Sequence, residues 1–262
     1  MGADEFVIAL DWKRREWIEA VSGQLRASPL PVRLLPNSIV RSLLERRTSR
    51  AIGLASIVDL HRAPLTSAEK LAKRFLDTAL ASVSLLILPP LMLLAALAIK
   101  FDSQGLIIFS QRRIGFDERP FKIYKFRTMS VQEDGPEVIH ARRNDPRVTW
   151  LGAALRQCSI DVLPQRFNVL KGDMSLIGPR PHAVPHHDQY RDAIASYAFR
   201  HNVKPGMIGW AQVNGVRGET RTIGRMARRG AFDLWYIDNW SLLLDLKIIW
   251  RTFVELMRQT AL

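Results

Sequence analysis

One aspartate stands in a setting that suits covalent phosphate chemistry. The stretch SIDVLPQ, residues 159–165, places Asp161 between two apolar residues and three positions before Pro164. Proline is tolerated only in the first turn of a helix, so a helix is predicted to begin near Asp161 or Val162, and Gly172 is well placed to end it. The N–H groups at such a start favour anions. Two interpretations stay open: Asp161 caps the helix, or it is a nucleophile beside a bound phosphate.

Several cations surround this stretch in the sequence. Each one alone would be interpreted as a solvated surface charge. Together with a carboxylate they suit phosphoryl transfer, which depends on positioning and on neutralising phosphate oxygens with Arg, Lys and Mg²⁺. The cations are Lys125 and Arg127 in KFRT, Arg156, Arg166, and Arg180 in GPRP.

An uncharged apolar segment, residues 78–99, is long enough to span a bilayer. Pro89 and Pro90 interrupt its middle and predict a kink. Cations flank both ends, which would hold both ends on the cytoplasmic side. A broken helix that enters and leaves the same leaflet satisfies both observations, whereas a straight anchor and a buried core helix are the alternatives. The flanking cations are Lys70, Lys73 and Arg74 before the segment, and Lys100, Arg112 and Arg113 after it.

The formal net charge of +13 calls for an anionic partner such as nucleic acid, anionic lipid or a phosphorylated small molecule. An Arg-rich run at 217–229 is compatible with nucleic acid. No recognised nucleic-acid module surrounds it, and that function would leave the apolar segment unexplained, so no nucleic-acid partner is predicted. The single cysteine, Cys158, excludes an internal disulfide and fits a reducing, cytoplasm-facing location.

Three histidines in RPHAVPHH could suggest zinc, since His182 and His186 have i, i+4 spacing and His187 follows. Pro181 and Pro185 disrupt the helix that this spacing requires. A loop or substrate-contact role is therefore favoured over metal binding.

The first 66 residues read as a separate unit. FVIAL, VRLLP and ASIVDL are strand candidates, and a helical apolar pattern follows the first of them. The unit has no Gly-rich phosphate loop and too few layers for a doubly wound core. Residues 1–66 are therefore predicted to be the tail of a domain, and Pro64 and the residues after it mark a linker into a second unit.

Longer motifs follow one another across residues 70–255. They are KRFLD, QRRIG, PFKIYKFRTM, DPRVTWLGAALR, SIDVLPQRFNVLKGDMSLIGPRP, KPGMIGWAQVNG and FDLWYIDNWSLLLDLKIIWRTF. In type and order they resemble the bacterial sugar transferase family, the polyprenyl-phosphate hexose-1-phosphate transferases. RPHAVPHH and VRGET resemble the branch that transfers glucose 1-phosphate to undecaprenyl phosphate. The resemblance implies that residues 1–66 are the C-terminal remnant of a nucleotide-binding-like, Rossmann-like α/β domain and that residues 67–262 are the sugar-phosphate transferase catalytic domain.

The resemblance implies that Asp161 is the nucleophile. It would attack the sugar-proximal phosphate of a UDP-sugar, release UMP and pass the sugar phosphate to undecaprenyl phosphate, which would start an exopolysaccharide repeat. Mg²⁺ would bridge Asp161 and the diphosphate. The matching cations, which the resemblance assigns to phosphate binding, are Lys125, Arg127, Arg156 and Arg180.

Two positions depart from the family pattern. The nucleophile is followed by Val162 where the family has glutamate, which leaves the chain impaired, inactive, or compensated by another acid such as Asp173 or Asp233. The helix break is Pro89-Pro90 instead of Ser-Pro, which keeps the kink but loses a hydroxyl.

These observations predict an α+β, monotopic enzyme with a re-entrant kinked helix at about residues 70–100. It would lie at the bacterial inner membrane with its catalytic domain facing the cytoplasm. The expected partners are a UDP-sugar, undecaprenyl phosphate and membrane lipid, with downstream glycosyltransferases and a second copy of the chain as open alternatives. A catalytically impaired homologue that binds lipid or a partner protein is the rival interpretation.

Overall fold

The computed structural model describes most of the chain. Predictions that fall on 131–144 and 217–221, among them VRGET and part of the Arg-rich run, lie outside the described residues. The chain divides into two compact units, Met1–Thr66 and Ser67–Leu262, and both contain helices and strands, which confirms the mixed class. The described residues are 5–9, 15–25, 28, 30–35, 50–52, 55–61, 65–130, 145–194, 197–216 and 222–260.

The first unit is a four-stranded sheet in the order β1-β2-β4-β3, with helix α1 packed on it. Strands β1 and β2 pair in parallel, and the other pairs are antiparallel. Apolar residues of α1 at helical spacing cover the buried side chains of Ile8, Val32 and Leu34. The predicted strand–helix–strand is thus confirmed. The elements are β1 (Phe6–Ile8), α1 (Arg15–Leu25), β2 (Val32–Leu34), β3 (Arg50–Ile52) and β4 (Ala55–His61).

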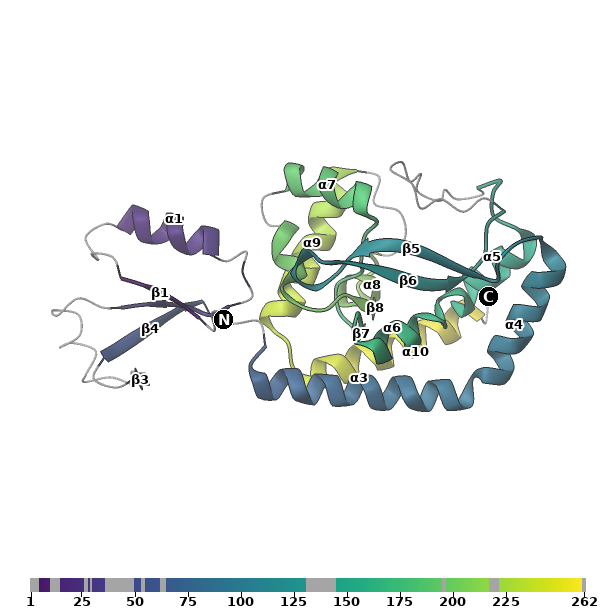
Figure 1. The fold of residues 1–262 in the computed structure, drawn as a ribbon, viewed down its shortest axis with the longest axis horizontal. Coiled ribbons are helices and arrows are strands. Elements are labelled where there is room, and N and C mark those ends of the chain that lie inside the picture. The colour runs from purple at the N-terminus through teal and green to yellow at the C-terminus, as the bar shows by residue number, and fades with distance from the viewer. Residues whose placement is uncertain are drawn as a thin grey trace. The chain divides into compact units, whose positions relative to one another are not determined.

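The second unit begins with two helices that meet at a bend. Helix α3 (Ser67–Ile87) and helix α4 (Pro89–Asp102) are bent by 64° about Leu88 (Figure 1). Pro89 and Pro90 occupy the first positions of α4, where a missing N–H costs nothing. No helix among the described residues is by itself long and apolar enough to cross a membrane, but the bent pair together meets the criteria of length and composition.

Two buried polar side chains of α3 bond to other elements of the second unit. Lys73 Nζ donates to Asp245 Oδ2 of α10 (Leu242–Thr260) at 2.7 Å, and both side chains are buried. Asp77 Oδ1 accepts from Ser175 Oγ and from the N–H of Leu176 in β7 (Ser175–Ile177), each at 3.0 Å. These bonds tie the helix to the rest of the unit.

Arg74 also binds protein, because its guanidinium donates to the carbonyls of Val169 and Leu170 at the end of α6 (Gln165–Lys171). Lys73 and Arg74 were expected to flank the apolar segment and to hold that end on the cytoplasmic side. The structure uses both inside the unit instead.

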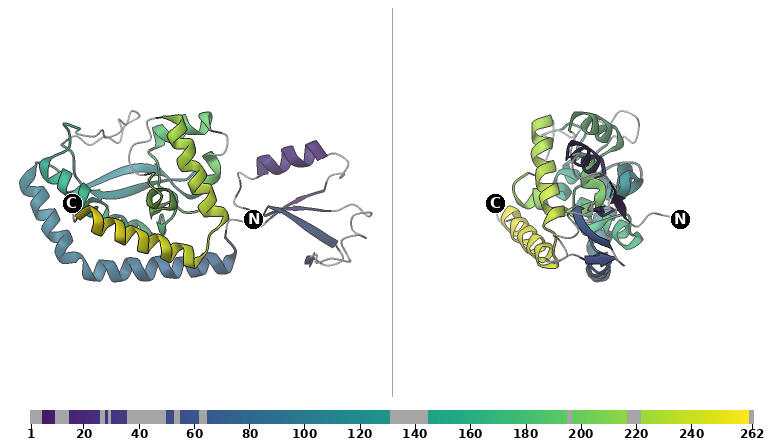
Figure 2. Two further views of the ribbon diagram at one scale, coloured as in Figure 1. Left: turned by 180° about the vertical axis from the view of Figure 1, so that it is seen from behind. Right: turned by 90° about the vertical axis from the view of Figure 1, so that its left-hand side faces the viewer.

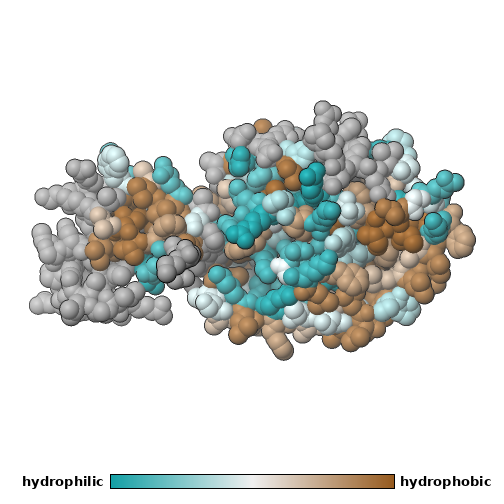
Figure 3. All heavy atoms as spheres, viewed as in Figure 1, coloured by the Kyte–Doolittle hydropathy of each residue, from teal (hydrophilic) through white to brown (hydrophobic). Residues whose placement is uncertain are grey.

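Large apolar side chains of the bent pair face outward. Phe75 is 75% exposed, Leu86 81% and Phe101 88%. Helix α10 runs beside α3 in both Figure 1 and Figure 2 and adds exposed Leu243 and Trp250. Hydrophobic surface accordingly gathers along α3 and α4 in Figure 3.

An antiparallel hairpin lies above α3 and α6 (Figure 1). Its strands pair β5 with β6, so that Phe109 faces Lys125 across the ladder and Arg113 faces Phe121. Phe126 packs with α4 and α5, whereas Ile123 packs with α3 and α6. Strands β7 and β8 form a short parallel pair behind it.

The remaining elements of the second unit complete this arrangement. They are β5 (Ile108–Ile114), η1 (Phe116–Glu118), β6 (Pro120–Phe126), α5 (Trp150–Gln157), η2 (Ile160–Val162), α7 (Val184–Ala193), η3 (Tyr197–Asn202), β8 (Gly206–Ile208), α8 (Trp210–Val213) and α9 (Ile223–Asp238).

Replacing Lys73 by methionine is expected to lower the free energy of unfolding by about 3 kcal/mol, because the buried Asp245 carboxylate loses its cation. Denaturant unfolding of the detergent-solubilised protein measures this. The double variant Lys73→Met/Asp245→Leu removes both charges and is expected to recover part of the loss. A cost below about 1 kcal/mol for Lys73→Met alone would contradict the importance of this pair.

Candidate active site

Asp161 lies in a short 3₁₀ turn, η2, and not at the start of α6. Ser159 has a left-handed backbone (φ 55°), the turn spans Ile160–Val162, and α6 begins only at Gln165 after Pro164. The predicted helix start near Asp161 or Val162 is therefore wrong, because the chain closes a tight turn before the proline. Gly172, with φ 90°, ends α6 as predicted. Asp161 is half-buried and does not cap an α-helix.

Arg156 reaches the site because α5 packs very closely on the strand end after β6. Thr149 caps α5 by accepting from the N–H of Gly152. A Cβ on Gly152 would lie 2.2 Å from the carbonyl oxygen of Thr128, so only glycine permits this approach. The contact lets Arg156 Nε donate to Thr128 Oγ1 at 2.9 Å. Burial lowers the pKa of Arg156, and Asp161 opposes that shift electrostatically.

Lys125 is a cation with a strongly lowered pKa. Burial, together with the charges of Arg180 and Arg113, lowers its pKa to about 7, while Asp161 acts in the opposite direction. The ammonium group is therefore close enough to both arginines and to Asp161 to feel their charges. A lysine with such a pKa gains from any added phosphate, which would favour its protonated form.

Arg180 extends from the loop Gly178–Pro181 that follows β7. This loop lies tightly on the start of β8, since a Cβ on Gly206 would meet the Gly178 nitrogen at 2.0 Å. The GPRP and KPG motifs therefore contact each other through their glycines, and a side chain at Gly206 would prevent this approach. Arg180 acts on both Lys125 and Arg229.

The structure thus brings Asp161 together with three of the four predicted cations, Lys125, Arg156 and Arg180. Two further arginines belong to the same charge cluster and were not assigned to it from the sequence. Arg113 was interpreted as a membrane-flanking charge, and Arg229 as part of the Arg-rich run. Arg113 lies in the motif QRRIG and Arg229 in the Arg-rich run, but neither signal assigns them to this cluster, because the faces they occupy depend on strand register and helix packing.

The Arg127 side chain bonds to residues just after α4 and not to the charge cluster. Its buried guanidinium donates to the carbonyls of Gln104 at 2.7 Å and of Ser103, and to Ser103 Oγ at 3.0 Å. These groups lie at the end of α4, so Arg127 holds the C-terminus of the bent pair. The structure shows a structural role for Arg127 and does not bring it into the cluster.

The acids proposed as substitutes for the missing glutamate are not available near Asp161. Asp233 Oδ2 binds Arg200 Nη2 at 2.6 Å, with both side chains buried. Asp173 follows α6 at the end away from Asp161, where it contacts Asn168. Compensation by either residue is therefore not supported.

Histidines of the RPHAVPHH stretch belong to a buried aromatic cluster. Burial and the charge of Arg200 lower the pKa of His182 well below its ordinary value, so the ring is neutral. His182 stacks on Tyr197, and His187 packs against His201. Among the described residues, no three His, Cys, Asp or Glu side chains are grouped to hold a metal; the side chain of His186 lies outside them.

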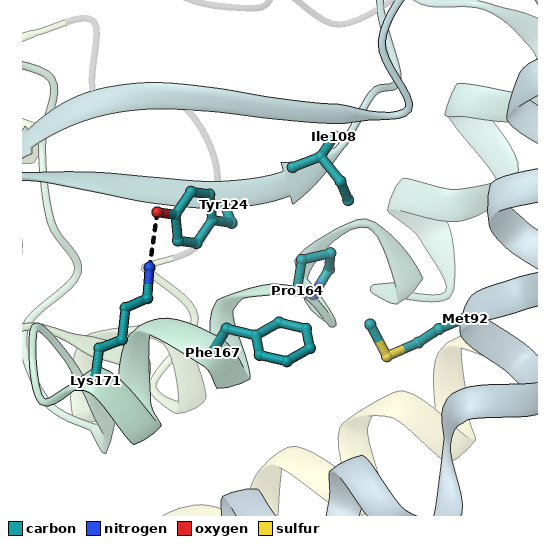
Figure 4. A pocket seen from close by; sticks show the side chains of 6 residues that line it. All are labelled: Met92, Ile108, Tyr124, Pro164, Phe167 and Lys171. Atoms are coloured by element: carbon teal, nitrogen blue, oxygen red, sulfur yellow. Dashed lines mark hydrogen bonds between the residues drawn. The ribbon is translucent and has the colours of Figure 1, made fainter.

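An open apolar cavity of about 230 Å³ lies between the hairpin, α6 and α4. Figure 4 shows Tyr124 and Ile108 from the hairpin, Phe167 and Lys171 from α6, and Met92 from α4 around it. Lys171 Nζ donates to the Tyr124 hydroxyl at 3.0 Å on one side of the cavity. Arg166, from the same helix as Phe167, donates to Ser84 Oγ near the bend of α3.

Comparison with known proteins gives a consistent result. Residues 68–259 match the family described as bacterial sugar transferase. The chain is 46% identical, over 90% of its length and 50% of the relative, to the UDP-glucose:undecaprenyl-phosphate glucose-1-phosphate transferase of Escherichia coli K12. It is 52% identical, over 71% of its length and 70% of the relative, to the protein of that name in Caulobacter vibrioides.

A relative with another sugar in its name is also similar. It is an Aeromonas hydrophila UDP-N-acetylgalactosamine-undecaprenyl-phosphate N-acetylgalactosaminephosphotransferase, 43% identical over 69% of this chain and 42% of the relative. The chain spans about half the length of several of the curated relatives it matches.

The affinity for UDP is expected to fall as the pH rises through 7, because Lys125 is charged below its pKa of about 7 and neutral above it. Calorimetric titration between pH 6 and pH 9 measures this. Lys125→Arg, which stays charged throughout, is expected to remove the pH dependence. An unchanged affinity across this range in the parent protein would contradict the assignment.

Replacing Arg127 by methionine is expected to cost about 2 kcal/mol of stability, since buried carbonyls at the end of α4 lose a charged donor. Affinity for UDP is expected to stay within about twofold. Arg156→Met serves as the control and should show the reverse pattern. A large loss of UDP affinity in Arg127→Met, without loss of stability, would show that Arg127 binds phosphate, as the sequence predicted.

Proposed function

This chain belongs to the bacterial sugar transferase family, and we propose that it transfers hexose 1-phosphate, in the first instance glucose 1-phosphate, from a UDP-sugar to undecaprenyl phosphate. The observation that carries the proposal is the placement of Asp161 among Lys125, Arg156 and Arg180. A half-buried carboxylate within a group of fixed cations suits attack on a diphosphate. The names of the relatives favour this activity over a purely binding homologue.

In the first step, an Asp161 carboxylate oxygen attacks the sugar-proximal phosphorus of the UDP-sugar. The bond from that phosphorus to the bridging oxygen breaks, and UMP leaves with the electron pair. The hexose phosphate is then an acyl phosphate on Asp161. In the second step, a phosphate oxygen of undecaprenyl phosphate attacks the same phosphorus, Asp161 leaves as carboxylate, and a lipid-linked diphosphosugar forms.

The cations have separate tasks in this reaction. Lys125 and Arg156 lie with Asp161, so they would hold the phosphate that is attacked. Arg180 acts electrostatically on both Lys125 and Arg229 and would reach the phosphate that leaves with the nucleoside. The fold positions these side chains before substrate binds, which lowers the cost of reorganisation in the transition state.

Mg²⁺ remains part of the proposal. Magnesium in such sites is commonly held by one or two carboxylates together with substrate phosphates. Asp161 fits as a single carboxylate ligand, whereas Val162 cannot serve as a second. A bound Mg²⁺ would neutralise charge that develops on the diphosphate oxygens.

The location of the enzyme is proposed from the outward apolar surface. Exposed side chains along α3, α4 and α10 would rest in the inner leaflet of the bacterial cytoplasmic membrane, with α3 and α4 as a re-entrant helix. A soluble nucleotide sugar and a membrane lipid phosphate could then meet at Asp161. The product would start an exopolysaccharide repeat for downstream glycosyltransferases. Self-association stays an open prediction.

The detergent-solubilised protein is expected to release UMP from UDP-glucose in the presence of undecaprenyl phosphate and Mg²⁺, and Asp161→Ala to release none. With UDP-glucose alone, intact-protein mass spectrometry should detect one added hexose phosphate that is absent from Asp161→Asn. UMP release that persists in Asp161→Ala would refute the nucleophile.

Val162→Glu is the matched variant for the departure from the family motif. Release by both the parent and Val162→Glu would show that valine is tolerated at this position. Release by Val162→Glu alone would establish the rival interpretation, a homologue silenced at one residue. UDP-galactose and UDP-N-acetylgalactosamine, assayed in parallel, test the choice of sugar.

A further inference from the structure

Four consecutive carbonyl groups, from Pro179 to His182, are each held by a hydrogen bond from outside the loop. Pro179 O accepts from the N–H of Gly206 at 2.9 Å, and His182 O accepts from the N–H of Ile114 at 3.1 Å. The two carbonyls between them accept from arginine side chains. Arg200 Nη2 donates to Arg180 O at 2.8 Å, and Arg113 Nη1 donates to Pro181 O at 3.1 Å.

It is unusual for four consecutive carbonyls of a connecting loop to accept hydrogen bonds from the protein, because loops normally lie at the surface with their carbonyls hydrated. The bonds here come from three separate elements, β5, β8 and η3. Pro179 and Pro181 further fix the φ angles on either side of Arg180. The backbone of one residue, Arg180, is therefore held in one position by the surrounding fold.

Arg200 is almost completely buried, and its guanidinium bonds to several protein groups. Its side chain is 1% exposed and binds Asp233 Oδ2 through Nη2 at 2.6 Å and through Nε at 3.1 Å. Nη1 lies 2.7 Å from Nδ1 of His182. Arginine can only donate, so Nδ1 is the acceptor and the His182 ring carries its proton on Nε2. One guanidinium thus holds both the carbonyl of Arg180 and a ring two residues later.

A buried ion pair of this kind contributes little net stability, because desolvation offsets much of the attraction between the charges. Its effect here is geometric. Arg200 carries a fixed fork of donors, and Asp233 fixes that fork in turn. One donor of the fork bonds to the backbone carbonyl of Arg180, whose side chain belongs to the charge cluster around Asp161.

We propose that Arg200, oriented by Asp233, is a positioning residue that sets the Arg180 side chain against the diphosphate of the nucleotide sugar. This inference rests on the proposed function. Arg200 itself touches no substrate in this scheme. It acts through the conformation of the Gly178–His182 loop, to which Arg113 also donates a hydrogen bond.

A double-mutant cycle between Arg200→Lys and Arg180→Ala tests the proposal. Lysine keeps the charge but cannot reach Asp233, His182 and the Arg180 carbonyl together. We expect Arg200→Lys to weaken UDP binding about tenfold in the parent background, and to have no further effect when Arg180 is already alanine. Calorimetric titration with UDP gives the affinities, and UMP release gives KM and kcat for all four proteins.

Additive losses in the cycle would overturn the proposal, because they would mean that Arg200 does not act through Arg180. An unchanged UDP affinity in a folded Arg200→Lys protein would overturn it as well. Asp233→Asn, which keeps the shape of the pair, is the second variant if Arg200→Lys does not fold, and the same non-additivity is expected of it.

Asp245→Asn is the matched control, since it breaks another buried ion pair that does not touch the loop. Its effect on UDP affinity is expected to be small and to add to that of Arg180→Ala. Failure of the proposed function gives a different result: UDP would bind to the parent with no UMP release, while the coupling between residues 200 and 180 in UDP binding would still be measurable.

Discussion

The second unit depends on an α3 helix that buries a lysine and an aspartate and turns large apolar residues outward. Lys73 and Asp77 are buried and bind α10 and β7, while Phe75 on the same helix is largely exposed. In a helix packed on a water-soluble core the pattern would be reversed. The buried bonds fix which face of α3 is free, and that face continues into α4 beyond the 64° bend. The apolar surface is consequently a product of the polar contacts behind it.

The same inward attachment supports the charge cluster. Arg74 of α3 binds the last carbonyls of α6, and Arg166 of α6 binds Ser84 near the bend, so the bent pair and the segment after Asp161 are joined at two points. Lys125, on the neighbouring hairpin, is partly buried beside like charges, and burial together with those charges lowers its pKa. Functional sites often carry such unfavourable charge arrangements, which a phosphate ligand would relieve. The surrounding fold holds these cations in place.

Buried arginines serve two different purposes in this chain. Arg127 donates mainly to backbone carbonyls and holds a helix end. Arg200 donates to Asp233, to His182 and to one loop carbonyl. Lys125, Arg156 and Arg180 instead form the cluster with Asp161. All are basic residues within or beside the recognised motifs, so motif membership does not distinguish them. The distinction lies in their partners: a buried guanidinium whose donors are bonded to protein groups is occupied by the fold.

The sequence by itself determined the local features. It predicted the break at Pro89-Pro90, the end of α6 at Gly172 and three of the strands described in the first unit, because prolines, glycines and apolar spacing act over a few residues. Its longer motifs predicted the family. Only the tertiary structure decided that Asp161 sits in a 3₁₀ turn, that Lys73 and Arg74 bind inward, and that Arg127 leaves the cluster while Arg113 and Arg229 join it. Those outcomes depend on partners distant in the chain, such as Asp245 for Lys73 and Ser103 for Arg127, and spacing along the sequence carries no information about them.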